Sequence, residues 1–136
     1  MRPSWVDYFF NIAEVVATRS HDAETQVGCV IVDENNRILT TGYNGFPPGI
    51  DDDLPPNTRP QKYPYMIHAE INAIASSRQD LKGSTLYCTH SPCIECSKAI
   101  ITAGVRIVRF ETPYKDFSES ARLLNLGKVR WEGWNG

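Results

Sequence analysis

Two short motifs in the second half of the chain carry side chains that can bind a metal ion. They are HAE at residues 68–70 and PCIEC at residues 92–96. Cys93 and Cys96 are three residues apart, so on a helix both sulfurs would lie on one side of the first turn. The partial positive charge and free N–H groups of a helix N-terminus favour the thiolate, which is the zinc-binding form. We therefore predict that His68, Cys93 and Cys96 bind one Zn²⁺ ion.

Three protein ligands leave one coordination position of a tetrahedral zinc ion for solvent. A structural zinc site has four protein ligands, and the sequence offers no obvious fourth, so the pattern favours a catalytic site. Zinc lowers the pKa of bound water from about 16 toward 7, which makes hydroxide available at neutral pH. Glu70 lies close to His68 along the chain, and we predict that it moves protons between this water and the substrate.

The two motifs together indicate a reaction class. H-x-E followed by P-C-x-x-C is the signature of zinc enzymes that hydrolyse the exocyclic amine of a nucleobase. A C-x-x-C pair alone is often redox-active or structural, and H-x-E alone occurs by chance. Their combination, with each motif at the start of a predicted helix, favours deamination. In such a site the backbone N–H of Ala69 is expected to donate to the pyrimidine carbonyl.

Apolar periodicity and turn residues predict the elements that position these motifs. We expect helices over 5–18, 67–77, 92–103 and 118–126, and strands over 27–32, 37–43, 84–89, 105–110 and 129–131. Pro92 is expected in the first helical turn, and residues 44–62, rich in proline and glycine, are expected to form a long loop. The order predicts an α/β fold in one domain spanning 1–136, with a mixed sheet between helices on both faces.

Further expectations concern packing in the first helix and the first two strands. The first two strands are expected to pair as an antiparallel hairpin. The first helix is expected to bury a face with Trp5, Phe9, Ile12 and Val16.

Composition narrows the possible partners and the compartment. The 136 residues include 41% hydrophobic and 22% charged residues, with a formal net charge of −2. That balance argues against a dedicated nucleic-acid binder, and no apolar run approaches the roughly 18 residues of a membrane span. The N-terminus does not resemble a signal peptide, so a cytoplasmic protein is expected. In that reducing compartment Cys29 and Cys88 are expected to be buried thiols without a disulfide.

Further motifs resemble one family over about residues 5–130. They are RS at 19–20, QVG at 26–28, GYNG at 42–45, KYPY at 62–65, NAI at 72–74 and ARLL at 121–124. With the two metal motifs, this set resembles the deoxycytidylate deaminases. The resemblance implies a three-layer α/β/α cytidine deaminase-like fold with a five-stranded mixed sheet. It also implies conversion of dCMP to dUMP and ammonia for thymidylate synthesis, in a homo-oligomer, commonly a hexamer, activated by dCTP and inhibited by dTTP.

The resemblance also assigns roles to residues outside the metal motifs. Asn44 is expected to bind the sugar 3′-hydroxyl, and Tyr114 to lie against the sugar or phosphate. Arg19 and Ser20 are candidate phosphate contacts. The candidate effector residues are Gly42, Tyr43, Gly45 and Lys62, with Mg²⁺ as a possible companion of a triphosphate effector. Ile50 stands where many relatives have a cysteine, so we expect one zinc ion per chain.

Three alternatives stay open at this point. One is a deaminase that acts on dCTP or on free cytidine. Another is a nucleic-acid editor, acting on tRNA adenosine or single-strand cytosine, although such enzymes need a basic channel that this composition does not suggest. The third is a zinc-stabilised binding module without activity, against which Glu70 and the missing fourth ligand argue.

Overall fold

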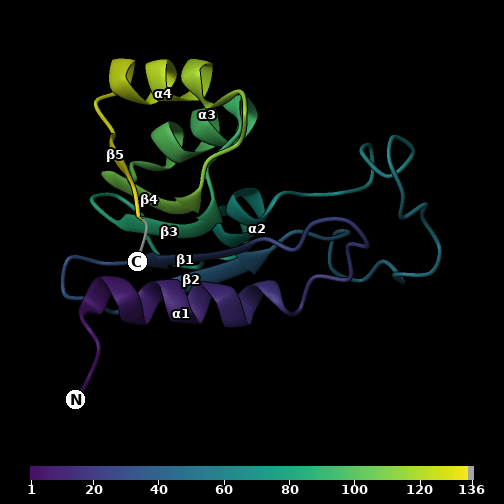
Figure 1. The fold of residues 1–136 in the computed structure, drawn as a ribbon, viewed down its shortest axis with the longest axis horizontal. Helices are drawn as coiled ribbons and strands as arrows, with labels where there is room; N and C mark the ends of the chain where they lie inside the picture. Colours follow the sequence, from purple (N-terminus) through teal and green to yellow (C-terminus); the bar gives the residue numbers. More distant parts are fainter. Residues whose placement is uncertain (135–136) are drawn as a thin grey trace.

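The computed structural model describes residues 1–134, and its helices and strands follow one another in the predicted order (Figure 1). They are α1 (Trp5–Ala17), β1 (Gly28–Val32), β2 (Ile38–Tyr43), α2 (Ala69–Ser76), β3 (Thr85–His90), α3 (Ile94–Ala103), β4 (Ile107–Thr112), α4 (Phe117–Leu126) and β5 (Arg130–Gly133). The strands form one sheet in the order β2-β1-β3-β4-β5. Strand β1 is antiparallel to β2 and β3, whereas β3, β4 and β5 are parallel, so the predicted mixed sheet is confirmed.

The sheet lies between two layers of helices (Figure 1). Helix α1 covers one face, where Phe9 and Phe10 pack with Val30, Val32 and Tyr87. Helices α2, α3 and α4 cover the other face, over a larger apolar core. These layers confirm the predicted three-layer architecture. In the described chain, no helix combines the length and apolarity that crossing a bilayer requires.

The two ends of the described chain meet beside α1. The indole Nε1 of Trp134, just after β5, donates to Asp7 Oδ1 at 3.2 Å. The Trp134 ring also stacks on Phe10, with ring centroids 6.3 Å apart. The last strand is therefore fastened to the first turn of the first helix.

Helix α1 buries the predicted face in part: Phe9 is buried and Ile12 and Val16 pack, partly buried, against the core, but Trp5 does not. Trp5 is 57% exposed, and the buried residues are Phe9, Phe10, Ala13 and Ala17. Strand β1 approaches the buried face closely, since a Cβ added at Gly28 would lie only 2.0 Å from the carbonyl oxygen of Ala13. Small residues are needed on this face of α1, and a hydrophobicity pattern undervalues them.

Two predicted bounds shift for local reasons. The helix predicted over 67–77 begins at Ala69, because Ile67 forms an isolated antiparallel bridge with Gly45. The strand predicted over 105–110 runs from 107 to 112, because the Val105 N–H is used in the turn after α3, where it donates to the Ile100 carbonyl.

Helix α3 begins two residues later than predicted. Cys93 has extended backbone angles (φ −75°, ψ 175°) and is the N-cap of the helix. Its sulfur accepts from the backbone N–H of Cys96 at 3.4 Å, as a polar N-cap side chain does. Pro92 therefore precedes the helix, and its predicted place in the first helical turn is wrong.

Candidate active site

Two helix N-termini bring the predicted metal ligands together. His68 is the N-cap of α2, Cys93 is the N-cap of α3, and Cys96 lies in the first turn of α3. The Nδ1 atom of His68 is 3.3 Å from each of the two sulfurs. The three ligand atoms lie within 4.8 Å of one another, and within residues 1–134 no other His, Cys, Asp or Glu joins this group. One imidazole and two sulfurs are the donor set of a catalytic zinc site, so the residues fit that ion.

The electrostatics of this group favour a thiolate at Cys93. The Cys96 thiol donates to Cys93, and His68 adds a second favourable contact, which together lower the pKa of Cys93 to about 4. The hydrogen bond to Cys93, together with burial, raises the pKa of Cys96, so without a metal ion the proton between the two sulfurs stays on Cys96. The Cys93 sulfur is therefore in the thiolate form, which is the form that binds zinc.

Glu70 lies in the first turn of α2, beside the metal group. Only 4% of its surface is exposed, and it lines the same pocket as His68 and Cys93. Burial raises its pKa to about 7, because a carboxylate loses solvation in this environment. A carboxyl group with a pKa near neutrality can both accept and donate a proton.

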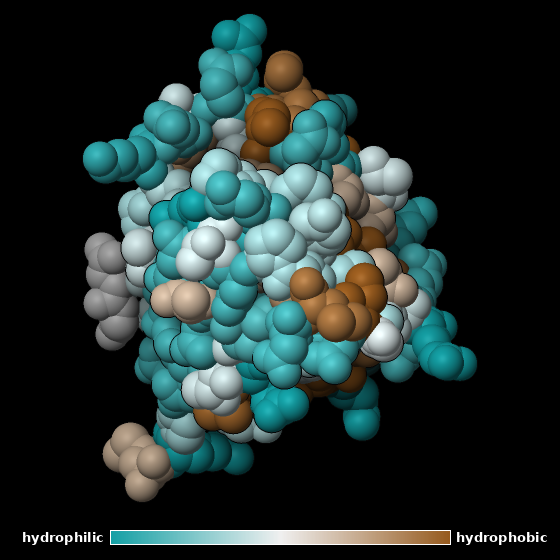
Figure 2. Space-filling view, turned by 90° about the vertical axis from the view of Figure 1, so that its right-hand side faces the viewer, coloured by the Kyte–Doolittle hydropathy of each residue, from teal (hydrophilic) through white to brown (hydrophobic). Residues whose placement is uncertain are grey.

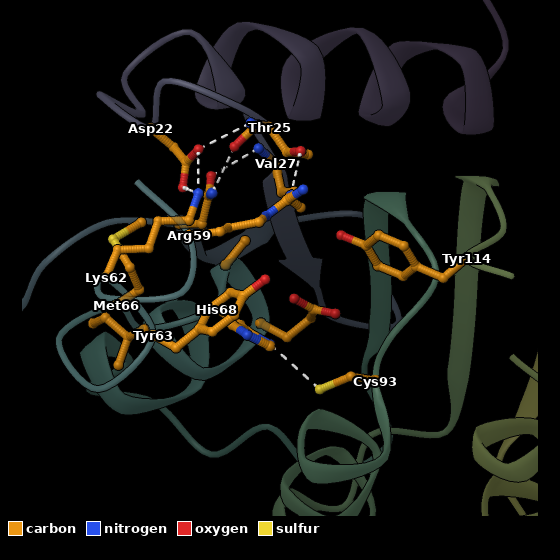
Figure 3. Close-up of a pocket in the computed structure, with 14 residues that line it drawn as sticks. Asp22, Thr25, Val27, Arg59, Lys62, Tyr63, Met66, His68, Cys93 and Tyr114 are labelled. Carbon is orange, nitrogen blue, oxygen red and sulfur yellow. Dashed lines mark hydrogen bonds and ion pairs between the residues drawn. The ribbon is translucent and has the colours of Figure 1, made fainter. Parts of the chain in front are cut away.

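The pocket extends from this metal group toward a cluster of charged residues (Figure 3). It is formed by residues before β1 and after β2, by the end of the long loop, and by the segments that begin α2, precede α3 and follow β4. The lining residues are Asp22, Thr25, Val27, Asn44, Arg59, Lys62, Tyr63, Met66, Ile67, His68, Ala69, Glu70, Cys93 and Tyr114. Figure 2 shows the side of the molecule that carries the long loop, whose surface is mostly hydrophilic with small apolar patches.

Asn44 lies in the pocket wall with its amide held in place. Its Oδ1 accepts from the backbone N–H of Val27, and its Nδ2 donates to the carbonyl of Thr25, both at 2.8 Å. The residue is 9% exposed. Because an amide nitrogen has two N–H groups, one donor of Asn44 remains for a ligand.

Tyr114 closes the pocket from the side of the parallel strands. Its backbone N–H donates to Ser91 Oγ at 2.8 Å, and its ring stacks on His90 at a centroid distance of 5.4 Å. The hydroxyl points toward the pocket in Figure 3. Burial raises the pKa of the Tyr114 phenol, so the group is a neutral hydrogen-bonding partner.

Arg19 and Ser20, the residues predicted to contact phosphate, do not line this pocket, and their phosphate role stays a prediction. Arg19 is exposed. Ser20 is 3% exposed, and its hydroxyl accepts from the backbone N–H of Asp22. Both residues precede the pocket segment, and the structure places no direct contact between them and the metal group.

Of the four candidate effector residues, three lie outside the pocket and one lines it. Gly42 is packed against α2, the carbonyl of Tyr43 accepts from Asn72, and Gly45 pairs with Ile67. These three line no part of the pocket.

Lys62 does line the pocket, where it is 3% exposed. Its Nζ is 2.9 Å from both carboxylate oxygens of Asp22 and 2.9 Å from Glu24 Oε1. Burial alone would lower the pKa of Lys62, but the two carboxylates outweigh it and raise the pKa. The ammonium group is therefore charged and fully engaged.

Arg59 is a pocket residue that the sequence analysis did not single out. Its Nη2 donates to Thr25 Oγ1 at 3.3 Å, and its Nε is 3.7 Å from Glu24 Oε1. Figure 3 shows its side chain crossing the upper part of the pocket. No periodicity or motif marks an arginine in a loop rich in proline, so only the folded loop reveals it.

Comparison with known proteins decides the family. A model of the cytidine and deoxycytidylate deaminase zinc-binding region matches residues 3–112. The chain belongs to this family of deaminases. Deoxycytidylate deaminase of Mus musculus is 45% identical over 130 residues, which cover 88% of this chain and 73% of the mouse protein.

Solved deaminase structures share the fold. The dCMP deaminase of cyanophage S-TIM5, in complex with dCMP and dUMP, has a TM-score of 0.86 at 33% identity and covers 98% of this chain and 99% of its own. A diaminohydroxyphosphoribosylaminopyrimidine deaminase/5-amino-6-(5-phosphoribosylamino)uracil reductase from Thermotoga maritima has a TM-score of 0.71 at 22% identity. It covers 95% of this chain and 36% of its own, a likeness of fold alone. This member of the family is therefore a deaminase enzyme with the cytidine deaminase-like fold predicted from its motifs.

Proposed function

We propose that this deaminase hydrolyses dCMP to dUMP and ammonia. The observation that carries the proposal is the buried Glu70 beside the His68, Cys93 and Cys96 group, at the end of a pocket with cations at its other end. The similarity to the mouse and phage enzymes, both deoxycytidylate deaminases, supports dCMP as the substrate. A nucleotide matches this arrangement, because its reactive base can lie at the metal group while its anionic phosphate lies at the cationic end.

The residues of the metal group have distinct tasks in this mechanism. His68, Cys93 and Cys96 would hold a zinc ion, which when bound lowers the pKa of a water molecule so that hydroxide is available at neutral pH. A Glu70 carboxylate oxygen accepts the proton of the attacking water and delivers it to the ring nitrogen of the base. The same carboxylate then takes the second proton of that water, from the hydroxyl group now on the base carbon, and delivers it to the amine, which leaves as ammonia while that oxygen becomes the carbonyl of the product. One residue thus serves as base and as acid.

The rest of the pocket places the substrate. The backbone N–H of Ala69 has no partner within the helix, because it lies at the start of α2, and it donates to the pyrimidine carbonyl. The remaining amide donor of Asn44 binds the sugar 3′-hydroxyl. Tyr114 packs against the sugar or the phosphate, and its side chain limits access of water to the base.

Assembly and regulation extend the proposal. By the family resemblance, the enzyme is a homohexamer in the cytoplasm that supplies dUMP for thymidylate synthesis, with dCTP as activator and dTTP as inhibitor. The GYNG loop and Lys62 are the candidate effector residues, and Mg²⁺ would accompany a triphosphate. Sedimentation velocity, and dCMP assays with each triphosphate, test these statements separately from the chemistry.

Substitution Glu70→Ala tests the chemical proposal. We expect zinc content to stay near one ion per chain, while ammonia release from dCMP falls by roughly 10²- to 10⁴-fold. Glu95→Ala is the matched control, because Glu95 is an exposed carboxylate near the start of α3 that pairs with Lys98. The Glu95 variant should keep its activity. A Glu70 variant within a few-fold of the parent rate would remove Glu70 from this role.

A substrate panel tests the assignment of dCMP. Ammonia release from dCMP should exceed release from dCTP, deoxycytidine and cytosine. Failure of the zinc-loaded parent enzyme to act on dCMP would overturn the proposed substrate. A shift of single-stranded oligonucleotides in gels at physiological salt would favour the nucleic-acid alternative.

A further inference from the structure

The pocket has two cationic side chains at the end away from the metal group. Among its described lining residues, Arg59 and Lys62 carry these charges. Two carboxylates, Asp22 and Glu24, balance them. A phosphate that enters the pocket therefore needs a cationic side chain that can leave its carboxylate partner, or one with N–H donors that no carboxylate uses.

Lys62 has no donor to offer. An ammonium group has three N–H donors, and three carboxylate oxygens lie 2.9 Å from Nζ. The side chains of Lys62 and Asp22 are each 4% exposed. Separating a buried ion pair leaves charges without compensation, which is strongly unfavourable. Lys62 therefore fastens the loop to the segment before β1.

Arg59 is in the opposite situation. Its side chain is 50% exposed, and its Nε is 3.7 Å from Glu24 Oε1. That oxygen already accepts from Lys62 at 2.9 Å and from the backbone N–H of Arg59 at 3.1 Å. One further donor contacts the Thr25 hydroxyl at 3.3 Å. A guanidinium group has five N–H donors in a planar fork, which suits two oxygens of one phosphate.

From these contacts we infer that Arg59 binds the phosphate of the substrate and that Glu24 competes with the phosphate for it. The inference rests on the proposed function, because it assigns one end of the same substrate. The phosphate takes over the Arg59 donors that face Glu24 and Thr25, and Glu24 stays paired with Lys62. Arg59 thereby distinguishes a nucleotide from a nucleoside. Glu24, by competing for Arg59, sets the size of this preference.

Steady-state kinetics of Arg59→Gln, with dCMP and with deoxycytidine, test this inference. The KM for dCMP should rise by roughly tenfold or more, as expected for loss of a charge-assisted hydrogen bond. The kcat should change little, because the phosphate contact is made equally in the bound substrate and in the transition state. Activity on deoxycytidine, which has no phosphate, should stay within about twofold.

Glu24→Gln should move the KM for dCMP in the opposite direction. Removing the competing carboxylate should lower the KM by about two- to fivefold, the range expected for an exposed ion pair. The double variant Arg59→Gln/Glu24→Gln should lose this gain, which separates Arg59 from Lys62 as the group released. Arg78→Gln is the matched control, since Arg78 is exposed and outside the pocket.

The outcomes are distinguishable from failure of the proposed function. A parent enzyme without dCMP activity would overturn that function itself. An active parent whose Arg59→Gln variant keeps its KM for dCMP would overturn the phosphate assignment, and a rise in KM for Arg19→Gln instead would move it to Arg19. Equal losses on dCMP and deoxycytidine would show that Arg59 only maintains the loop, and would also overturn the inference.

Discussion

The amide of Asn44 is engaged on two sides before any ligand binds. Substitution Asn44→Ala leaves the buried N–H of Val27 without an acceptor, so we expect the free energy of unfolding to fall by about 1–3 kcal/mol. Urea titration measures this loss, and Asn35→Ala, in the exposed hairpin turn, is the control. If Asn44→Ala also deaminates dCMP as fast as the parent, Asn44 supports the fold but does not bind the sugar.

At the scale of residues, local spacing decided what the sequence could predict. His68, Cys93 and Cys96 converge as expected, because each precedes or begins a helix and the ligand types are specific. Arg59 and its partner Glu24 are 35 residues apart and belong to irregular segments. No propensity fixes the path of such a loop, so their meeting could not be predicted.

At the scale of elements, the distance between β2 and α2 positions the metal group. A Cβ added at Gly42 would lie 2.4 Å from the Ala69 carbonyl oxygen and 2.4 Å from the Ala73 nitrogen. Gly42→Ala should therefore displace α2 and lower the free energy of unfolding by about 1–3 kcal/mol. Activity should fall with it, because α2 carries Glu70.

Gly45→Ala is the matched control for this prediction. An added Cβ there meets no atom closer than 3.7 Å, so thermal unfolding should change little. Equal unfolding midpoints for the two variants would contradict the close contact between β2 and α2.

The prediction for α1 was right for Phe9, Ile12 and Val16 but missed the small residues of the buried face. Hydrophobicity favoured Trp5, whereas β1 at Gly28 packs closely against the backbone of Ala13 and Ala17. The sequence predicts that a helix is amphipathic, but the distance to the neighbouring strand decides which stripe is buried.

A carboxylate pair between α1 and β4 makes stability depend on pH. Burial, and the nearby Glu14 carboxylate, raise the pKa of Glu111 from 4.5 to about 8. The folded protein thus retains a proton that the unfolded chain loses, so stability should fall as pH rises from about 4.5 to about 8. Glu111→Gln should flatten this fall in a series of thermal melts, whereas Glu119→Gln, exposed on α4, should not.

At the scale of the whole molecule, a bound metal ion would tie α2 to α3. The ligands lie 25 and 28 residues apart in the chain, so binding should stabilise the folded state. Removing zinc with a chelator should lower the thermal midpoint by roughly 10 °C, the effect of free zinc about a thousandfold above its dissociation constant. Cys93→Ala should already show the lower midpoint and should not respond to the chelator.

The architecture of the whole sheet was predictable only in part. Alternation of strands and helices after residue 84 predicts parallel neighbours, because such crossovers follow simple rules, and β3, β4 and β5 obey them. The place of β1 between β2 and β3 depends on long-range pairing, such as that of Cys29 with Cys88. Periodicity within a strand does not identify its second neighbour.

The bond from Trp134 to Asp7 has a practical consequence. It gathers both ends of the described chain on the side of the molecule away from the long loop (Figure 1). A linker attached beside Asp7 or Trp134 would hold the enzyme on a sensor or resin by the side opposite the long loop. Dissolved nucleotides would still reach the pocket beside the long loop, so the immobilised protein should keep the kcat of the free protein.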